Sequence, residues 1–124
     1  MRASTPEVIE LFGRAMNEGD LDGAMSLYEP EAVFVPQPGT SLAGLEAIRE
    51  ALSGLFAHRP SISGEIAKVL RAGDVALVAN AWKLAGTQPD GQALALEGLS
   101  TDIVRRQPNG SWLILVDDPW GGAG

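Results

Sequence analysis

The chain of 124 residues carries a formal net charge of −7 and contains no cysteine. That length suits one domain around a single core. The lack of cysteine excludes disulfides and thiol chemistry, which indicates a cytoplasmic setting. The nine Lys and Arg residues form no cluster, so neither nucleic acid nor an acidic membrane surface is an expected partner. No apolar run reaches the roughly 20 residues that would span a bilayer, and the N-terminus lacks the apolar stretch of a secretion signal.

In chain order, the first predicted element is a helix that begins at the capping-box signal Ser4–Glu7. Apolar residues follow at helical spacing through Met16 and give this helix one buried face. Gly19 ends the helix, and Asp20 is placed to cap a second one. The second helix is predicted to end at Pro30 and to bury a stripe of four residues: Leu21, Ala24, Met25 and Tyr28.

A short strand over residues 32–35 is predicted next. It is closed by Pro36 and Pro38, which have no N–H to donate to a neighbouring strand. A third helix is predicted after Gly44 and is expected to stop by Pro60, because apolar residues repeat at helical spacing between Leu45 and Phe56. The first half of the chain therefore predicts three helices and one strand.

The second half of the chain predicts an antiparallel meander of four strands, with Gly and Pro clusters marking the three turns between them. The second of these strands is almost wholly apolar, which predicts that both of its faces are covered. Gly98 in the third strand predicts a bulge or bend. The strands are predicted over Ile62–Ala72, Val75–Ala85, Ala93–Arg106 and Trp112–Val116.

Four segments occur in an order that is found in a known family: Asn17–Asp20, Tyr28–Ala32, Gly44–Arg49 and Arg105–Trp112. In this order they resemble nuclear transport factor 2-like domains, the group that holds ketosteroid isomerases and SnoaL-like polyketide cyclases. The resemblance implies one α+β domain over residues 1–124, with a core of about residues 6–120 and a loose Gly-rich tail over 121–124. Its expected architecture is a cone-shaped, curved antiparallel sheet wrapped around a long N-terminal helix with two further helices, as in cystatin-like α+β folds.

The same resemblance implies an apolar interior that holds a small molecule, and a homodimer that forms through the convex face of the sheet. No organic cofactor is required. With one His and no Cys, a His/Cys zinc site is excluded, and no third oxygen ligand for magnesium is evident beside Asp117 and Asp118. His58 lies at a predicted helix end, where a cation near the C-terminus is favoured and a catalytic triad is not expected.

Asp102 is the first candidate for chemistry. It lies among apolar residues of the long third strand, and counted back from the Asn109–Gly110 turn it matches the aspartic acid that donates a hydrogen bond in the oxyanion hole of ketosteroid isomerases. A carboxyl group in an apolar cavity keeps its proton more readily, so it can act as a donor at neutral pH. The alternative is an ionised Asp102 that pairs with Arg105, Arg106 or a backbone amide.

The other isomerase residues are absent. The resemblance aligns Phe12 with the oxyanion-hole tyrosine and Pro36 with the general-base aspartate. Phe12 has no hydrogen to donate and Pro36 cannot accept a proton, so steroid isomerisation by that route is excluded, and any catalysis needs another base.

Asp117 is the candidate for that base. Neighbouring residues on a strand point to opposite faces, so one of Asp117 and Asp118 is expected to face the interior. If Asp117 shares a face with Leu113 and Leu115, it lies opposite Asp102, and the two carboxyl groups can divide the acid and base roles. The alternative is a solvated strand end or a turn before Pro119.

The candidate ligand-binding residues are mostly aromatic. Asn80 and Trp82 place polar donors on one face of an apolar strand, as ligand pockets do, although Asn80 can instead satisfy a bulge. Trp120 is expected to close the mouth of the cavity or to pack on a partner subunit. The predicted ligand-binding set is Phe12, Met16, Tyr28, Phe34, Asn80, Trp82 and Trp120.

These features predict a protein that binds a small, mostly apolar organic molecule. The candidate reaction is proton transfer of the isomerase, cyclase or dehydratase kind, with Asp102 as acid or hydrogen-bond donor and Asp117 as base. The alternative is a non-catalytic ligand-binding or dimerisation module of the same fold. In that case Asp102 would pair with arginine and the chain's own side chains would fill the cavity.

Overall fold

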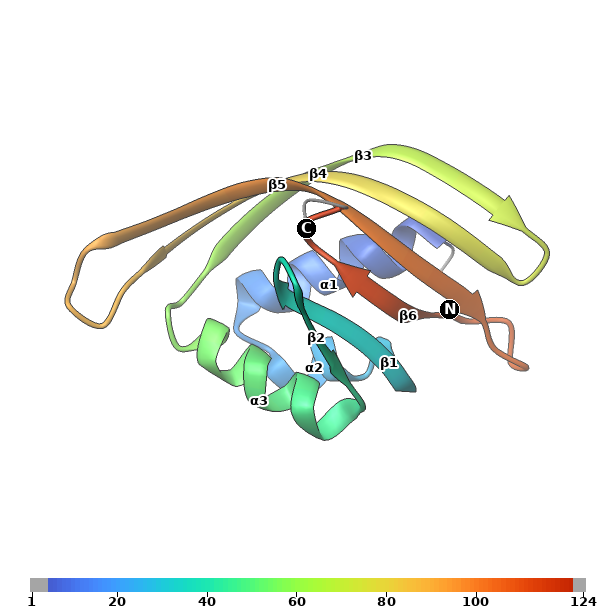
Figure 1. Ribbon diagram of the computed structural model, residues 1–124, viewed down its shortest axis with the longest axis horizontal. Helices are drawn as coiled ribbons and strands as arrows, with labels where there is room; N and C mark the ends of the chain where they lie inside the picture. Colours follow the sequence, from blue (N-terminus) through green and yellow to red (C-terminus); the bar gives the residue numbers. More distant parts are fainter. Residues whose placement is uncertain (1–4, 122–124) are drawn as a thin grey trace.

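Three helices lie on the concave side of one curved sheet of six strands (Figure 1). The computed structural model describes residues 5–121. The helices are α1 (Thr5–Glu18), α2 (Leu21–Met25) and α3 (Leu45–Phe56). The sheet has the order β2-β1-β6-β5-β4-β3. Its strands are β1 (Tyr28–Gln37), β2 (Thr40–Ala43), β3 (Ser61–Ala72), β4 (Val75–Thr87), β5 (Ala93–Arg106) and β6 (Trp112–Asp118). This mixed α+β architecture confirms the predicted fold class.

The junction of α1 and α2 forms as its sequence predicts. Gly19 adopts φ +69°, a left-handed conformation that favours glycine. The Asp20 side chain accepts a hydrogen bond of 2.9 Å from the N–H of Gly23 and so caps α2. The capping-box prediction at Ser4 lies outside the described residues.

The second helix is shorter than predicted, and Pro30 does not end it. Helix α2 stops at Met25, and Tyr28 is already the first residue of β1. The cause is a long-range pairing: the carbonyl of Leu27 accepts the N–H of Ile114 at 2.7 Å, and Tyr28 pairs in parallel with Ile114 of β6. Helical spacing of apolar residues cannot reveal such a contact, so the start of β1 was not predicted.

Strand β1 also runs further than predicted, and β2 was not predicted. The chain continues through Pro36 and turns at Gly39, whose φ is +84°, before β2 pairs antiparallel with β1. The register between these strands shifts between Phe34 and Gln37, which accommodates a proline that cannot donate. Strand β2 has four residues, too few for a recognisable alternation.

The predicted meander is confirmed, since β3, β4, β5 and β6 pair antiparallel in sequence order. Gly98 does not form a bulge, because β4 and β5 keep an unbroken register through the pair of Trp82 and Gly98. A side chain at this position would place its Cβ 3.0 Å from the Trp82 ring and 3.2 Å from the Pro119 carbonyl. Gly98 is therefore required for close approach. The bulges lie elsewhere, at Ala67 of β3 and Leu115 of β6.

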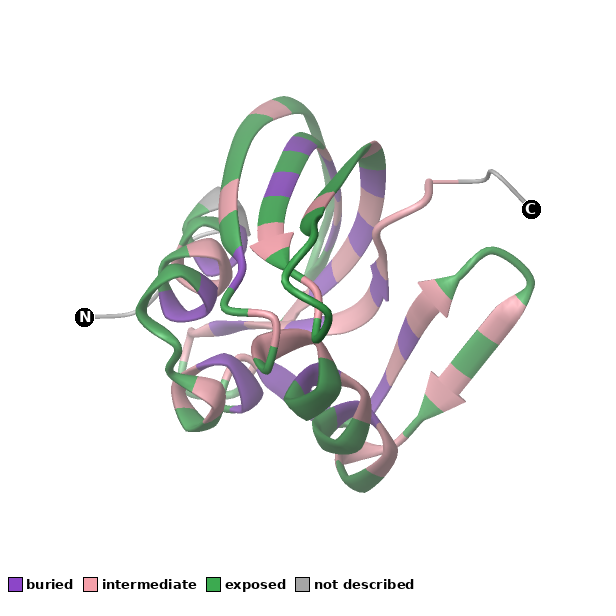
Figure 2. Ribbon diagram, turned by 90° about the vertical axis from the view of Figure 1, so that its left-hand side faces the viewer, coloured by how far each residue is buried: buried purple, intermediate pink, exposed green. Residues whose placement is uncertain are grey.

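The prediction that both faces of β4 are covered is wrong for one copy of the chain. Buried and exposed residues alternate along the long strands, as the coloured bands of Figure 2 show. The inner face packs on the helices around a core that includes Val8, Ile48, Leu52, Val78, Val104 and Ile114. The outer face exposes three large apolar side chains: Leu70, Val75 and Leu99.

Candidate functional site

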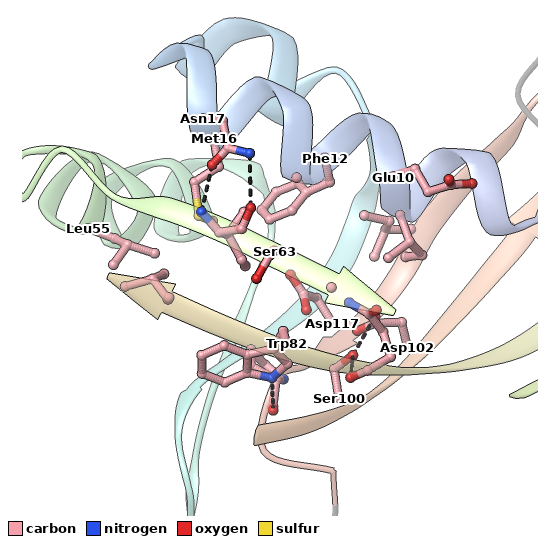
Figure 3. Close-up of a pocket in the computed structure, with 18 of the residues that line it drawn as sticks. Glu10, Phe12, Met16, Asn17, Leu55, Ser63, Trp82, Ser100, Asp102 and Asp117 are labelled. Carbon is pink, nitrogen blue, oxygen red and sulfur yellow. Dashed lines mark hydrogen bonds between the residues drawn. The ribbon is translucent and has the colours of Figure 1, made fainter. Parts of the chain in front are cut away.

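A cavity of about 640 Å³ lies between α1 and the inner face of the sheet. Its wall comes from α1, α3 and strands β1, β3, β4, β5 and β6, and most of the lining side chains are apolar. Figure 3 shows Phe12 and Met16 of α1 above the cavity, with Trp82 of β4 on the opposite side and two carboxyl groups at its inner wall. A volume of a few hundred Å³ with a mostly apolar lining is typical of small-molecule sites.

A β-bulge turns Asp117 into this cavity. Ile103 pairs with Val116 and the next residue, Val104, pairs with Ile114, so Leu115 is the extra residue of β6. The bulge reverses the alternation of faces, and as a result Ile114 and Asp117 are both buried although three positions separate them. The expectation that Asp117 faces inward is met. The predicted reason, a face shared with Leu115, is wrong.

Asp102 and Asp117 face each other directly across β5 and β6. Asp102 is 4 % exposed and Asp117 is 8 % exposed. The Ser100 hydroxyl donates to Oδ2 of Asp102 at 3.2 Å, and the backbone N–H of Asp118 donates to Oδ1 at 3.2 Å. On the other side, the Tyr28 hydroxyl donates to Oδ2 of Asp117 at 2.5 Å. Each of the two facing carboxyl groups therefore has its own hydrogen-bond donors.

Burial raises the pKa of Asp102 well above its usual range, and the facing carboxyl of Asp117 raises it further. Burial also raises the pKa of Asp117, but hydrogen bonds from Asp102 and Tyr28 act in the opposite direction. Like charges directly opposite each other in a sheet repel. The repulsion between the two carboxyl groups is removed when Asp102 holds a proton and donates a hydrogen bond to an ionised Asp117.

The predicted alternative in which Asp102 pairs with arginine is wrong. Arg105 holds Glu29 through two hydrogen bonds, of 2.8 and 2.5 Å, and Arg106 pairs with Asp74. The backbone-amide part of that alternative is present, through the N–H of Asp118. Among the described residues, no Lys or Arg forms a salt bridge with either Asp102 or Asp117.

Six of the seven predicted ligand-binding residues line the cavity, and one does not. Tyr28 is 3 % exposed and lies behind the wall, where its ring packs edge-on against Phe12 with centroids 5.7 Å apart and an interplanar angle of 85°. Its hydroxyl contacts Asp117. The six that line the cavity are Phe12, Met16, Phe34, Asn80, Trp82 and Trp120.

Asn80 lies on the inner face of β4, between Ile66 of β3 and Ser100 of β5. The backbone carbonyl of Asn80 accepts a hydrogen bond from the Ser100 hydroxyl at 3.3 Å. The side-chain amide of Asn80 packs on Gly64, where an added Cβ would lie 2.8 Å from the amide oxygen. Asn80 therefore serves the cavity wall and also lies beside the β3 bulge, so both of its predicted roles are compatible with the structure.

Two tryptophans close one end of the cavity. The indole N–H of Trp82 donates to the Pro119 carbonyl at 2.8 Å, and its ring meets that of Trp120 at 5.5 Å with an interplanar angle of 74°. The indole N–H of Trp120 is buried, and it has no acceptor within the part of the chain that the structure describes. The segment after β6 thus forms a wall of the cavity.

Several lining residues were missed from the sequence. Ser100 was detectable, because it lies two positions before Asp102 on the same strand face. Asn17 was predicted only as part of a helix end, yet its amide exchanges two hydrogen bonds with the backbone of Ile62, of 2.9 and 2.6 Å. These bonds hold the open edge of β3 against α1. Ser63 and Glu10 also line the cavity.

Within the described residues, no group of three His, Cys, Asp or Glu side chains is arranged to hold a metal ion. His58 lies outside the cavity lining, and its Nδ1 is 3.0 Å from the Thr87 carbonyl oxygen. Likewise, none of the helices in residues 5–121 has the length and apolar character needed to cross a membrane.

Comparison with known proteins identifies the same fold. The family model of the SnoaL-like domain matches residues 8–112. A ketosteroid isomerase-like protein from Erwinia carotovora atroseptica superimposes with a TM-score of 0.79 at 18% identity, over 89% of this chain and 87% of that one. An NTF-2 like protein from Shewanella oneidensis MR-1 superimposes with a TM-score of 0.75 at 19% identity, over 90% of this chain and 92% of that one.

A third structure comes from Streptomyces avermitilis and is described as a candidate dehydratase of the NTF2-like family. It gives a TM-score of 0.72 at 22% identity, over 89% of this chain and 88% of that one. No curated protein matches the sequence. At these identities the solved structures show a common fold and leave the chemistry to the residues of the site.

Proposed function

The chain belongs to the SnoaL-like domain family, and from this premise we propose that it binds a small, mostly apolar organic molecule and acts on it by proton transfer. One observation supports this most strongly: two buried carboxyl groups form part of the wall of an otherwise mostly apolar cavity of about 640 Å³. A mostly apolar lining with a few convergent polar groups and shifted pKa values is the usual signature of an active site.

In this proposal Asp102 is the neutral partner and Asp117 is the base. Asp117 removes a proton from a ligand carbon, and the same proton returns to another atom of the ligand, so no oxidant or co-reactant is needed. When the ligand binds, the carboxyl hydroxyl of Asp102 turns from Asp117 to the ligand oxygen, where its hydrogen bond stabilises the developing negative charge. The reaction class is isomerisation, cyclisation or dehydration, and the likeness to a candidate dehydratase is consistent with that class.

The residues aligned with the isomerase tyrosine and base support this reassignment. Phe12 and Pro36 both line the cavity, but neither can transfer a proton. The base must then come from another element, and Asp117 of β6 is the buried carboxyl that meets Asp102 across the sheet. General-base work requires such a group within hydrogen-bond reach of the ligand.

The non-catalytic alternative is less well supported. A simple module was expected to pair Asp102 with arginine and to fill its own cavity, and the described structure has neither feature. We also propose that the chain is one cytoplasmic domain and that two copies pair through the exposed apolar face of β3, β4 and β5. A homodimer of this kind would supply the missing cover for β4.

Proton transfer can be tested without the natural substrate by using 2-decalone, a neutral bicyclic ketone with acidic C–H groups. We expect the wild-type protein to accelerate exchange of its α-hydrogens with D₂O, measured by mass spectrometry. Asp117→Asn is expected to lose about 100-fold or more of this rate, as general-base removal does. Binding of the ketone without exchange would support the non-catalytic module and contradict the proposed reaction.

The role of Asp102 is tested by calorimetric binding of the same ketone. Asp102→Leu keeps a side chain of similar size but has no donor, so affinity is expected to fall about 10-fold through loss of one hydrogen bond, whereas Asp102→Asn, whose amide N–H can still donate, is expected to keep most of the affinity. Glu50→Gln removes an exposed carboxylate on α3, away from the cavity, and serves as the matched control. Equal affinity in wild type and a folded Asp102→Leu protein would remove Asp102 from the site.

A further inference from the structure

Tyr28 reaches the carboxyl pair from the strand on the far side of Asp117. Strand β1 pairs in parallel with β6, which brings Tyr28 and Asp117 together although 89 positions separate them in the sequence. The Tyr28 ring is buried beneath Phe12 and does not line the cavity. Its hydroxyl therefore contacts Asp117 and cannot contact a ligand in the cavity.

The hydrogen-bond donors are divided unequally between the two carboxyl groups. The Ser100 hydroxyl and the Asp118 N–H each reach Asp102 at 3.2 Å, at the long end of the normal range. The Tyr28 hydroxyl reaches Asp117 at 2.5 Å, the separation typical of an O–H donor on a charged oxygen. Asp117 is thus the carboxyl group whose negative charge the surrounding structure stabilises better.

We propose that Tyr28 is a positioning residue whose hydroxyl selects Asp117 as the carboxyl that accepts a proton and leaves Asp102 as the one that holds it. The proposal rests on the proposed function, because it assigns the two roles that proton transfer needs. Burial raises the pKa of Tyr28 well above its usual value, so the hydroxyl remains a donor.

No other group near the pair makes the same distinction. Asp118 of β6 adds negative charge near Asp117 and so raises its pKa. The ionisable side chains of α1 at the cavity are Glu10, Arg14 and Glu18, and all three are exposed at its rim. The residues that α3 contributes to the lining, Leu52 and Leu55, carry no charge. Apart from the facing carboxyl of Asp102, the Tyr28 hydroxyl is the side-chain donor to Asp117 among the described groups.

The test is a pH titration of the aspartate carboxyl carbons by carbon-13 NMR in ligand-free protein, with Asp102→Asn and Asp117→Asn to assign the signals. In wild type, Asp117 is expected to lose its proton at a lower pH than Asp102. In Tyr28→Phe, the Asp117 midpoint is expected to rise by about one to two pH units, the effect of one hydrogen bond to a charged group. An Asp117 midpoint that stays within about 0.3 units of wild type would overturn the proposal.

Ser100→Ala is the matched control, since it removes a hydroxyl from Asp102 and leaves Tyr28 in place. Its Asp117 midpoint is expected to move by less than half the shift seen in Tyr28→Phe, and an equal shift would argue against a specific role for Tyr28. Phenylalanine keeps the ring that packs on Phe12, so the Tyr28→Phe variant is expected to fold.

A second measurement needs no variant of Tyr28. The chain has one tyrosine, so the carbon that bears its hydroxyl gives one assigned signal, which is expected to follow the titration of Asp117 and to lose that step in Asp117→Asn. A Tyr28 signal that follows Asp102 instead would reject the assignment. The titration uses ligand-free protein, so an unexpected titration would reject the role of Tyr28 and leave the proposed proton transfer to be tested by ketone exchange. If the titration is as expected but no ketone exchange occurs, only the proposed reaction is rejected.

Discussion

Asp102 and Asp117 show how a sheet can hold two facing carboxyl groups away from water. An ionised pair would place two like charges opposite each other, and no Lys or Arg of the described chain forms a salt bridge with either of them. One shared proton removes most of that repulsion, and the donors Tyr28, Ser100 and the Asp118 N–H satisfy the remaining oxygens. The pair therefore provides one protonated and one ionised carboxyl group without the full destabilisation that two buried like charges would cause.

This arrangement predicts an unusual dependence of stability on pH. The pKa of Asp102 is raised by folding, so its contribution to stability is full below the unfolded value of about 4 and is lost as pH rises through the folded value. Asp102→Asn cannot titrate. We expect the wild-type unfolding midpoint to fall relative to that of Asp102→Asn between about pH 5 and pH 8, measured by thermal denaturation. A constant difference across that range would show that Asp102 titrates normally.

For single residues, the sequence predicted which side chains belong to the site better than it predicted which side chains they contact. Asp102 was predictable because it interrupts an apolar strand. Asp117 was predicted to face inward on simple alternation, and the bulge at Leu115 produced the same result by another route. The bond from Tyr28 to Asp117 was not predictable, because it depends on a parallel pairing of distant strands. Local patterns indicate which face a residue occupies and carry no information on which distant side chain it meets.

At the level of helices and strands, the space around a glycine decides what replacing it would do. Gly98 lets the Trp82 indole and the Pro119 carbonyl lie against β5, and this contact shapes the closed end of the cavity. Gly54, in contrast, is an exposed residue of α3 with open space around it. The two glycines therefore have opposite consequences for stability.

Gly98→Ala is expected to lower the free energy of unfolding by about 1–3 kcal/mol, because the new methyl group forces the Trp82 ring or the segment at Pro119 to move. Gly54→Ala is expected to raise it by about 0.5–1 kcal/mol, since alanine favours the helix. Urea denaturation of both variants measures these changes. Equal and small effects at the two positions would mean that the Trp82–Gly98 contact is not tight.

The α2 cap gives a second test at this scale. Asp20→Ala removes the acceptor for the Gly23 N–H and is expected to cost about 1 kcal/mol of stability, whereas Asp20→Asn keeps an acceptor oxygen and is expected to cost much less. Urea denaturation again gives the comparison. If both variants lose stability equally, the charge of Asp20 matters more than its hydrogen bond.

The first and third helices and the long strands were predicted close to their observed bounds because their periodicity is local, whereas the second helix was predicted to end at Pro30 and ends at Met25. The missing parts were β2 and the start of β1, whose residues carry weak patterns and form strands only through pairing. The apolar composition of β4 was correctly recognised, but its outer face is uncovered in one copy of the chain. Prediction therefore failed where pairing with distant segments decides the structure.

On the scale of the whole molecule, the exposed apolar side chains of β3, β4 and β5 are the feature that one chain leaves unexplained. Contiguous exposed apolar surface commonly marks an interface. We expect the wild-type protein to be a dimer by light scattering, and a double variant Leu70→Glu and Leu99→Glu to be a folded monomer. Glu50→Gln is expected to remain dimeric. A wild-type monomer at micromolar concentration would contradict the proposed pairing.

The claim that joins these scales is that a neutral, mostly apolar molecule binds in the hollow between α1 and the sheet, next to the paired carboxyl groups. The most direct measurement is a crystal structure of the wild-type protein with 2-decalone. The account predicts the ketone between Phe12 and Trp82, with its oxygen within hydrogen-bond distance of Asp102. A hollow that has collapsed onto its own side chains, with the ketone elsewhere or absent, would contradict it.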